Sequence, residues 1–152
     1  MQHQDPLKNL YLLRDADADD LTAVAALAKR QRFRAGERIF HEGDEAHAMY
    51  LVALGTVEIL VSGDETMVAV IGSGGEFGEI AFFDRGKRSA SACARETSEI
   101  VSLPYEGLRR VLAERPGLSL LVHRNACTFL ARCLRQTSLD LSFARELSRR
   151  HL

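Results

Sequence analysis

The residues best suited to chemistry lie between Gly75 and Ala90, where a glycine, a glutamate and an arginine interrupt an apolar segment. Gly78 has no side chain, so a ligand can approach the backbone closely there. An ionised Glu79 only accepts hydrogen bonds, which suits a sugar hydroxyl. Arg88 follows nine positions later and offers a planar fork of donors for phosphate oxygens. A helical turn after the glycine would point backbone N–H groups at an anion. The pattern predicts a pocket for a ribose that carries a phosphate, and therefore binding rather than catalysis.

The same segment contains a motif with parts at fixed offsets. Phe77-Gly78-Glu79-Ile80-Ala81 followed by Arg88-Ser89-Ala90 resembles the phosphate-binding cassette of cyclic nucleotide-binding domains. This is the family of the catabolite activator protein and of the regulatory subunits of cAMP-dependent protein kinase. The turn His41-Glu42-Gly43-Asp44 and the strand pair around Gly55 match further landmarks of the family. The likeness extends over roughly residues 12 to 116.

The resemblance implies a role for each residue of the cassette. Arg88 would grip the cyclic phosphate, and its alternative is an ion pair with Glu76 or Asp84. Glu79 would accept a hydrogen bond from the ribose 2′-hydroxyl, and its alternative role is that of a negative charge at a helix N-terminus. The remaining contacts are expected from the rest of the motif, namely Phe77, Gly78, Ile80, Ala81, Ser89 and Ala90. A serine at position 89 is compatible with either adenine or guanine, and we expect cAMP to be preferred to cGMP.

One position departs from the family pattern. The residue before the arginine is commonly proline, and here it is Lys87. The substitution removes a rigid φ angle and adds a positive charge near the phosphate. We expect it to alter the stiffness of the loop or the affinity rather than abolish binding.

Apolar residues outside the cassette are expected to complete the pocket. Val57, Val68 and Ile71 are candidates for the wall against the sugar and base, although all three could be ordinary core residues. By resemblance, a C-terminal helix would move over the base when ligand binds. The candidate lid residues are Phe129, Arg132, Leu139 and Phe143.

The pattern of elements predicts a mostly β fold with flanking helices. Asp17 is a candidate N-cap for a helix that would end near Arg30. From residue 31 to 103, short alternating runs are separated by glycine and aspartate turns, which is typical of a double-sheet jelly-roll β-barrel. Helical spacing returns over about 104–150, with a break at Pro116 and a broad apolar stripe beyond it. That stripe should cover the barrel, the ligand or a second copy of the chain, and a homodimer is one expected outcome.

The composition favours one soluble domain over residues 1–152, with a net charge of −1 that argues against direct DNA binding. No apolar run is long enough for a membrane span and the N-terminus does not resemble a signal peptide, so we expect a cytoplasmic protein. No helix-turn-helix is apparent after the helices, so output would pass through an unknown protein effector or through oligomerisation.

Two other classes of function remain open. One is an interaction module that keeps the fold without its ligand. The other is a cupin-like metalloenzyme, suggested by His41 and His47 beside an acidic turn, although the spacing of these histidines does not fit the metal motif. We expect no catalytic residue, no metal and no cofactor other than the cyclic nucleotide ligand.

Overall fold

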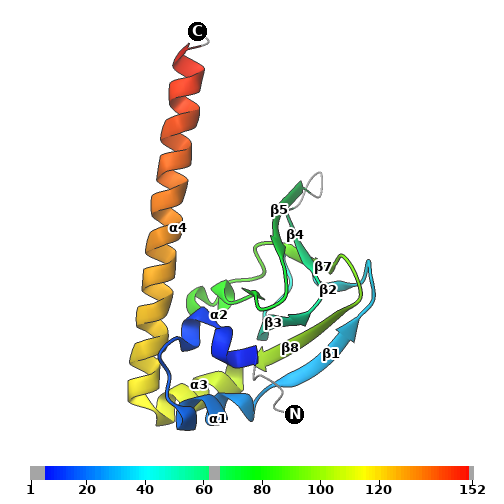
Figure 1. The fold of residues 1–152 in the computed structure, drawn as a ribbon, viewed down its shortest axis with the longest axis vertical. Coiled ribbons are helices and arrows are strands. Elements are labelled where there is room, and N and C mark those ends of the chain that lie inside the picture. The colour runs from blue at the N-terminus through cyan, green and yellow to red at the C-terminus, as the bar shows by residue number, and fades with distance from the viewer. Residues whose placement is uncertain (1–5, 62–65, 151–152) are drawn as a thin grey trace.

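The computed structural model describes residues 6–61 and 66–150. Two antiparallel sheets of four strands pack together, and helices flank them at both ends of the chain (Figure 1). This confirms the predicted jelly roll with N-terminal and C-terminal helices. The strands are β1 (Lys29–Phe33), β2 (Arg38–Phe40), β3 (Ala48–Leu54), β4 (Val57–Val61), β5 (Thr66–Ile71), β6 (Glu76–Phe77), β7 (Ser91–Ala94) and β8 (Ser98–Pro104). The helices are η1 (Pro6–Asn9), η2 (Tyr11–Leu13), α1 (Ala18–Ala25), α2 (Ile80–Asp84), α3 (Tyr105–Glu114) and α4 (Pro116–Arg150), where η marks a 3₁₀ helix.

The strand order is β1-β8-β3-β6 in one sheet and β2-β7-β4-β5 in the other. Strands that are distant in sequence, such as β1 and β8, therefore pair side by side. The inner faces of the two sheets enclose an apolar cluster of Val52, Val57, Phe77, Ala92 and Ile100, each at most 4% exposed. A larger apolar cluster joins the sheet of β3 and β8 to the helices. Sheet-on-sheet packing thus holds the short strand β6, which leads directly into the cassette.

The N-terminal helix is shorter than its sequence pattern indicates. The Asp17 side chain accepts a hydrogen bond from the Asp20 N–H at 2.8 Å, which confirms the predicted N-cap. The helix ends at Ala25, however, and the expected end near Arg30 is wrong. Lys29 and its neighbours instead form β1, whose residues pair in register with β8. Pairing with a strand about seventy residues away outweighs the local helical spacing.

The C-terminal region forms two helices separated at the predicted proline. Pro116 occupies the first position of α4, where its missing N–H costs no hydrogen bond. Near its start, α4 packs on the helical core through Leu118 and Val122. Its distal half extends clear of the sheets (Figure 1) and exposes large apolar side chains such as Leu134 and Phe143. In the described part of the chain, no helix combines the length and the apolar character needed to cross a membrane.

Candidate functional site

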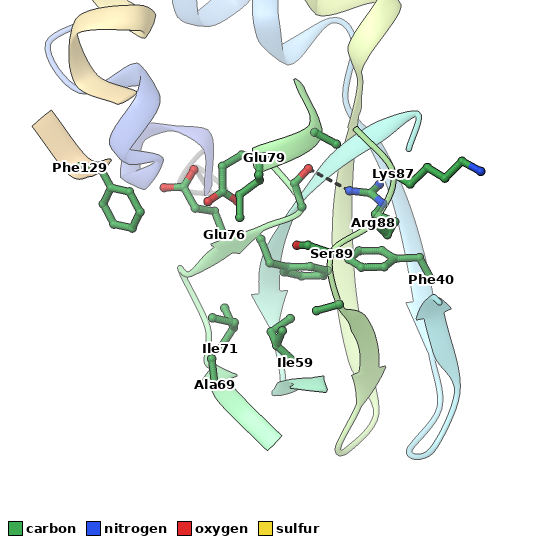
Figure 2. Close-up of a pocket in the computed structure, with 15 residues that line it drawn as sticks. Phe40, Ile59, Ala69, Ile71, Glu76, Glu79, Lys87, Arg88, Ser89 and Phe129 are labelled. Atoms are coloured by element: carbon green, nitrogen blue, oxygen red, sulfur yellow. Dashed lines mark hydrogen bonds between the residues drawn. The ribbon is translucent and has the colours of Figure 1, made fainter. Parts of the chain in front are cut away.

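The cassette borders a cavity of about 270 Å³ between the sheet of β4 and β5, the helix α2 and the side of α4. Figure 2 shows Glu76 and Glu79 on one side and Arg88 and Lys87 on the other, with Ile59, Ala69 and Ile71 below them. The lining residues come from six elements and the loops between them: Phe40, Ile59, Ala69, Ile71, Glu76, Phe77, Gly78, Glu79, Ile80, Ala81, Lys87, Arg88, Ser89, Ala90 and Phe129. Every cassette residue expected from the sequence is therefore brought to one cavity.

Arg88 is the central cation of this site and is only 6% exposed. Its Nη1 donates to the Gly78 carbonyl at 3.0 Å and to the Tyr105 hydroxyl at 3.2 Å, and its Nη2 donates to the Ala48 carbonyl at 2.6 Å. The guanidinium carbon lies 4.0 Å from the centre of the Phe40 ring. These contacts fix the orientation of the side chain, since a planar guanidinium bound on several sides cannot rotate.

The charge of Arg88 has no carboxylate partner within ion-pair distance among the described residues, and Glu76 and Asp84 do not pair with it. All of the acceptors given above are neutral oxygens. The Nε atom is buried and has no hydrogen-bond partner within residues 6–61 and 66–150. A buried cation with a free donor is unfavourable unless an anion compensates it. The arrangement can therefore hold an anion on the Arg88 side of the cavity.

Gly78 is required by the closeness of Arg88. Its φ is +79°, a conformation that residues with a side chain rarely adopt. A Cβ atom there would lie 2.9 Å from Arg88 Nη1 and 3.2 Å from Tyr50 Cδ2. The Tyr105 hydroxyl also donates to the Gly78 carbonyl, so glycine, tyrosine and arginine form one hydrogen-bonded unit.

Two carboxyl groups, those of Glu76 and Glu79, lie on the other side of the cavity (Figure 2). Burial raises the pKa of Glu76 to about 8, while the Tyr11 N–H has a smaller lowering effect and Glu79 a smaller raising one. Burial also raises the pKa of Glu79, against the lowering effects of a backbone hydrogen bond, the Tyr11 side chain and the charge of Arg88. Both shifts follow from removing a carboxylate from water.

Tyr11 links these carboxyls to the helices. Its N–H donates to Glu76 Oε1 at 2.8 Å, and its side chain hydrogen-bonds to Glu79. Its ring stacks on Phe129 of α4 with the ring centres 4.2 Å apart. The Asn125 side chain of α4 donates to the carbonyls of Leu12 and Arg14, which attaches η2 to the same helix. A residue 65 positions before Glu76 thus touches both the site and α4.

The apolar wall differs in part from the expected one. Ile71 lines the cavity as predicted, together with Ile59 and Ala69. Val57 does not, because it lies in the core between the sheets and is fully buried. Val68 is 57% exposed, since it lies where the pairing of β4 and β5 shifts register and the neighbouring Ala69 takes the inward direction.

Only one of the four candidate lid residues reaches the cavity. Phe129 lines it, whereas Arg132, Leu139 and Phe143 lie further along α4 and are exposed. At about 1.5 Å of rise per residue, Leu139 and Phe143 lie roughly 15 and 21 Å further along the helix than Phe129, beyond reach of the cavity. Lys87, the departure from the family pattern, lies at the rim with its Nζ 3.9 Å from Glu45 Oε1, and both side chains are exposed.

Several lining residues were not anticipated, namely Phe40, Ile59, Ala69 and Glu76. The sequence suggests Glu76 as an ion-pair partner of Arg88, and its place immediately before the cassette is the signal that could have predicted its position in the lining. The histidines of the acidic turn show no metal site: His41 Nδ1 lies 3.8 Å from Asp44 Oδ2, and no group of three potential ligands occurs within residues 6–61 and 66–150.

Comparison with known proteins agrees with this geometry. The family model of the cyclic nucleotide-binding domain matches residues 30–115. The Cyclic AMP receptor protein of Thermus thermophilus is 33% identical over 138 residues, which are 89% of this chain and 62% of that protein. A crystal structure of the Thermus thermophilus catabolite activator protein superposes with a TM-score of 0.75 at 33% identity, over 88% of this chain and 62% of that one.

A second solved structure covers a matching length. The N-terminal domain of a transcriptional regulator from Streptomyces coelicolor superposes with a TM-score of 0.73 at 30% identity, over 87% of this chain and 94% of that chain. By contrast, this chain spans less than two thirds of the length of the first curated relatives that it matches. The likeness therefore concerns one domain of those proteins.

Proposed function

This chain belongs to the cyclic nucleotide-binding domain family, and from that premise we propose that its cavity binds cAMP in preference to cGMP. Binding serves regulation, and the chain itself catalyses no reaction. The cyclic phosphate lies against Arg88, the ribose against Glu79 and the base against the apolar wall. The conformational response to ligand binding passes to α4, and from there to a protein effector or to a second copy of the chain.

The single observation that carries the proposal is the buried, unpaired guanidinium of Arg88. Neutral oxygens position it, yet no carboxylate neutralises it among the described residues. Burying an uncompensated charge is costly, and a phosphodiester supplies both the opposite charge and acceptors for Nε. The anion therefore gains more from this site than it would from an exposed arginine.

The rest of the cavity suits a purine nucleoside. Glu79 accepts a hydrogen bond from the 2′-hydroxyl, while Ile59, Ala69 and Ile71 provide apolar contact for the sugar and base. Ser89 is the hydroxyl side chain of the lining and can donate or accept one hydrogen bond. Guanine has one more polar substituent to satisfy than adenine, so an apolar wall with a single hydroxyl favours adenine.

α4 is the element through which binding is expressed. Phe129 touches the cavity on one side and the Tyr11 ring on the other. A ligand that contacts Phe129 differently in two positions of α4 shifts the equilibrium between them. Phe129 is thus the lid residue that we propose, with Arg132, Leu139 and Phe143 outside the contact.

The exposed side of α4 fits a second copy of the same helix. Leu130, Leu134 and Leu141 follow one another at spacings of four and seven, and each is about half exposed or more. Apolar residues at this heptad spacing form the contact line of a coiled coil. We propose that Leu134→Glu converts a dimer to a monomer in sedimentation experiments, whereas Leu139→Glu, on the opposite face, leaves the mass unchanged. If the Leu134→Glu and Leu139→Glu variants sediment with the same mass, a dimer through this face of α4 is contradicted.

Isothermal titration with cAMP and with cGMP tests the binding proposal directly. We expect one site per chain, with the tighter affinity for cAMP. Ser89→Ala shows whether the hydroxyl contacts the base, because it should reduce the affinity for cGMP selectively if serine contacts guanine. No heat and no shift in melting temperature with either ligand at millimolar concentration would instead favour an interaction module that has lost its ligand.

A further inference from the structure

Glu76 has a buried oxygen for which the fold provides no partner. It sits on the short strand β6, and its side chain lines the cavity beside Glu79 (Figure 2). Oε1 accepts the Tyr11 N–H at 2.8 Å. Oε2 is shielded from solvent and has no hydrogen-bond partner among the described residues. Buried polar atoms are nearly always hydrogen-bonded, so an exception beside a ligand cavity points to the ligand.

The groups around Glu76 determine which of the two carboxyls carries a proton. Burial raises the pKa of Glu79, but a backbone hydrogen bond, the Tyr11 side chain and the charge of Arg88 act against that rise. Burial raises the pKa of Glu76 to about 8, and no ion pair to this carboxyl occurs within residues 6–61 and 66–150. The groups that act on Glu76 are the Tyr11 N–H of η2, which lowers its pKa, and the charge of Glu79, which raises it. Two close carboxyls titrate as a pair, and the groups that lower the pKa of Glu79 favour placing a shared proton on Glu76.

We propose that Glu76 is a further ligand-contacting residue, whose neutral Oε2–H donates a hydrogen bond to the ribose 2′-oxygen while the Glu79 carboxylate accepts a hydrogen bond from the 2′-hydroxyl. This inference rests on the proposed binding of a cyclic nucleotide. A hydroxyl has one proton to donate and lone pairs to accept with, so a carboxylate and a carboxylic acid together satisfy it fully. A deoxyribose would leave both carboxyls without that partner.

A dependence of affinity on pH follows from this contact. Binding requires the neutral form of Glu76, and loss of its proton places a second negative charge beside Glu79 and the anionic ligand. With a titration midpoint near 8, the affinity of the wild type for cAMP should fall about tenfold between pH 7 and pH 9. Neither the cyclic phosphodiester nor adenine titrates in this range, so the protein is the source of the effect.

The test measures the affinities for cAMP and 2′-deoxy-cAMP by calorimetry at pH 7, 8 and 9. Glu76→Gln retains a donor that does not titrate, so its affinity for cAMP should be close to that of the wild type at pH 7 and nearly constant to pH 9. Glu76→Ala should bind cAMP about three- to tenfold more weakly at pH 7 and 2′-deoxy-cAMP less than twofold more weakly. Glu106→Gln, an exposed carboxyl on α3, is the matched control and should behave as the wild type.

Two results would overturn the inference while leaving the binding proposal intact. One is a Glu76→Gln variant that keeps the tenfold fall with pH, and the other is a Glu76→Ala variant that weakens both ligands equally. Failure of the wild type to bind either cyclic nucleotide at any pH would refute the proposed function itself. A carbon-13 NMR titration of the ligand-free protein gives a separate check, because a Glu76 midpoint below pH 6 contradicts the neutral acid whatever the calorimetry shows.

Discussion

Replacing Arg88 by methionine separates the ligand role of the guanidinium from its structural role. Methionine keeps most of the length and apolar contact with Phe40 but removes the charge. Truncating one member of a buried charged pair typically costs about 2–5 kcal/mol, which corresponds to a roughly 30- to 4,000-fold loss of cAMP affinity. The wide range reflects how fully the bound phosphate is shielded from water.

The effect on folding should be much smaller. Of the three oxygens that Arg88 contacts, the Gly78 carbonyl keeps the Tyr105 hydroxyl as a donor, whereas the Ala48 carbonyl loses the 2.6 Å bond from Nη2. Leaving one buried acceptor unsatisfied costs about 1–3 kcal/mol, or roughly 2–12 °C in melting temperature for a chain of this size. Removal of a buried cation offsets part of this cost.

Calorimetry of cAMP binding and thermal unfolding without ligand give the two quantities. Arg109→Met is the matched control, because Arg109 also lies over aromatic rings, 5.2 Å from the centre of Phe82, but does not line the cavity. The control should change cAMP affinity less than threefold. An Arg88→Met protein that remains folded and binds cAMP as tightly as the wild type would refute the assignment of the phosphate to this guanidinium.

Three further expectations concern the carboxyls and the backbone. Glu79→Gln should weaken cAMP more than 2′-deoxy-cAMP in competition binding, and equal losses would place the 2′-hydroxyl elsewhere. Gly55→Ala should destabilise the fold by more than about 1 kcal/mol in urea unfolding, because φ is +110° and a Cβ would lie 2.2 Å from Ser98 Oγ. Gly36→Ala is the control: φ there is +88° but a Cβ would meet open space, so this variant measures the cost of the dihedral angle alone. Burial raises the pKa of Glu76 from its ordinary 4.5 to about 8 in the folded protein, so the contribution of this group to stability is fully present below about pH 4.5. That contribution, on the order of a few kcal/mol, should be lost in the ligand-free wild type as pH rises to about 8. Glu76→Gln should lack this loss in urea titrations at several pH values, and an identical slope would contradict the raised pKa.

Local features of this protein were accessible from the chain alone. The cassette from Phe77 to Ala90 is contiguous, so its glycine, glutamate and arginine come together through short-range geometry, and the cavity contains all of them. The Asp17 cap is likewise a contact over three residues. Alternation along β4 indicated a strand, although it did not reveal that Ile59 rather than Val57 faces the cavity, because both positions share one side of the strand.

Other features of the site depend on partners that are distant in sequence. β1 begins at Lys29, where the expected helix would still continue, because β8 pairs with it. Tyr11 reaches the carboxyls from 65 positions away, and Phe129 is the part of α4 that meets the site. The electrostatic surroundings were equally hidden from the chain alone. Burial among residues from distant segments raises the pKa of Glu76 and encloses the Arg88 guanidinium, which has no carboxylate within ion-pair distance among the described residues. Desolvation is a property of the packed surroundings, and no spacing along the chain encodes it.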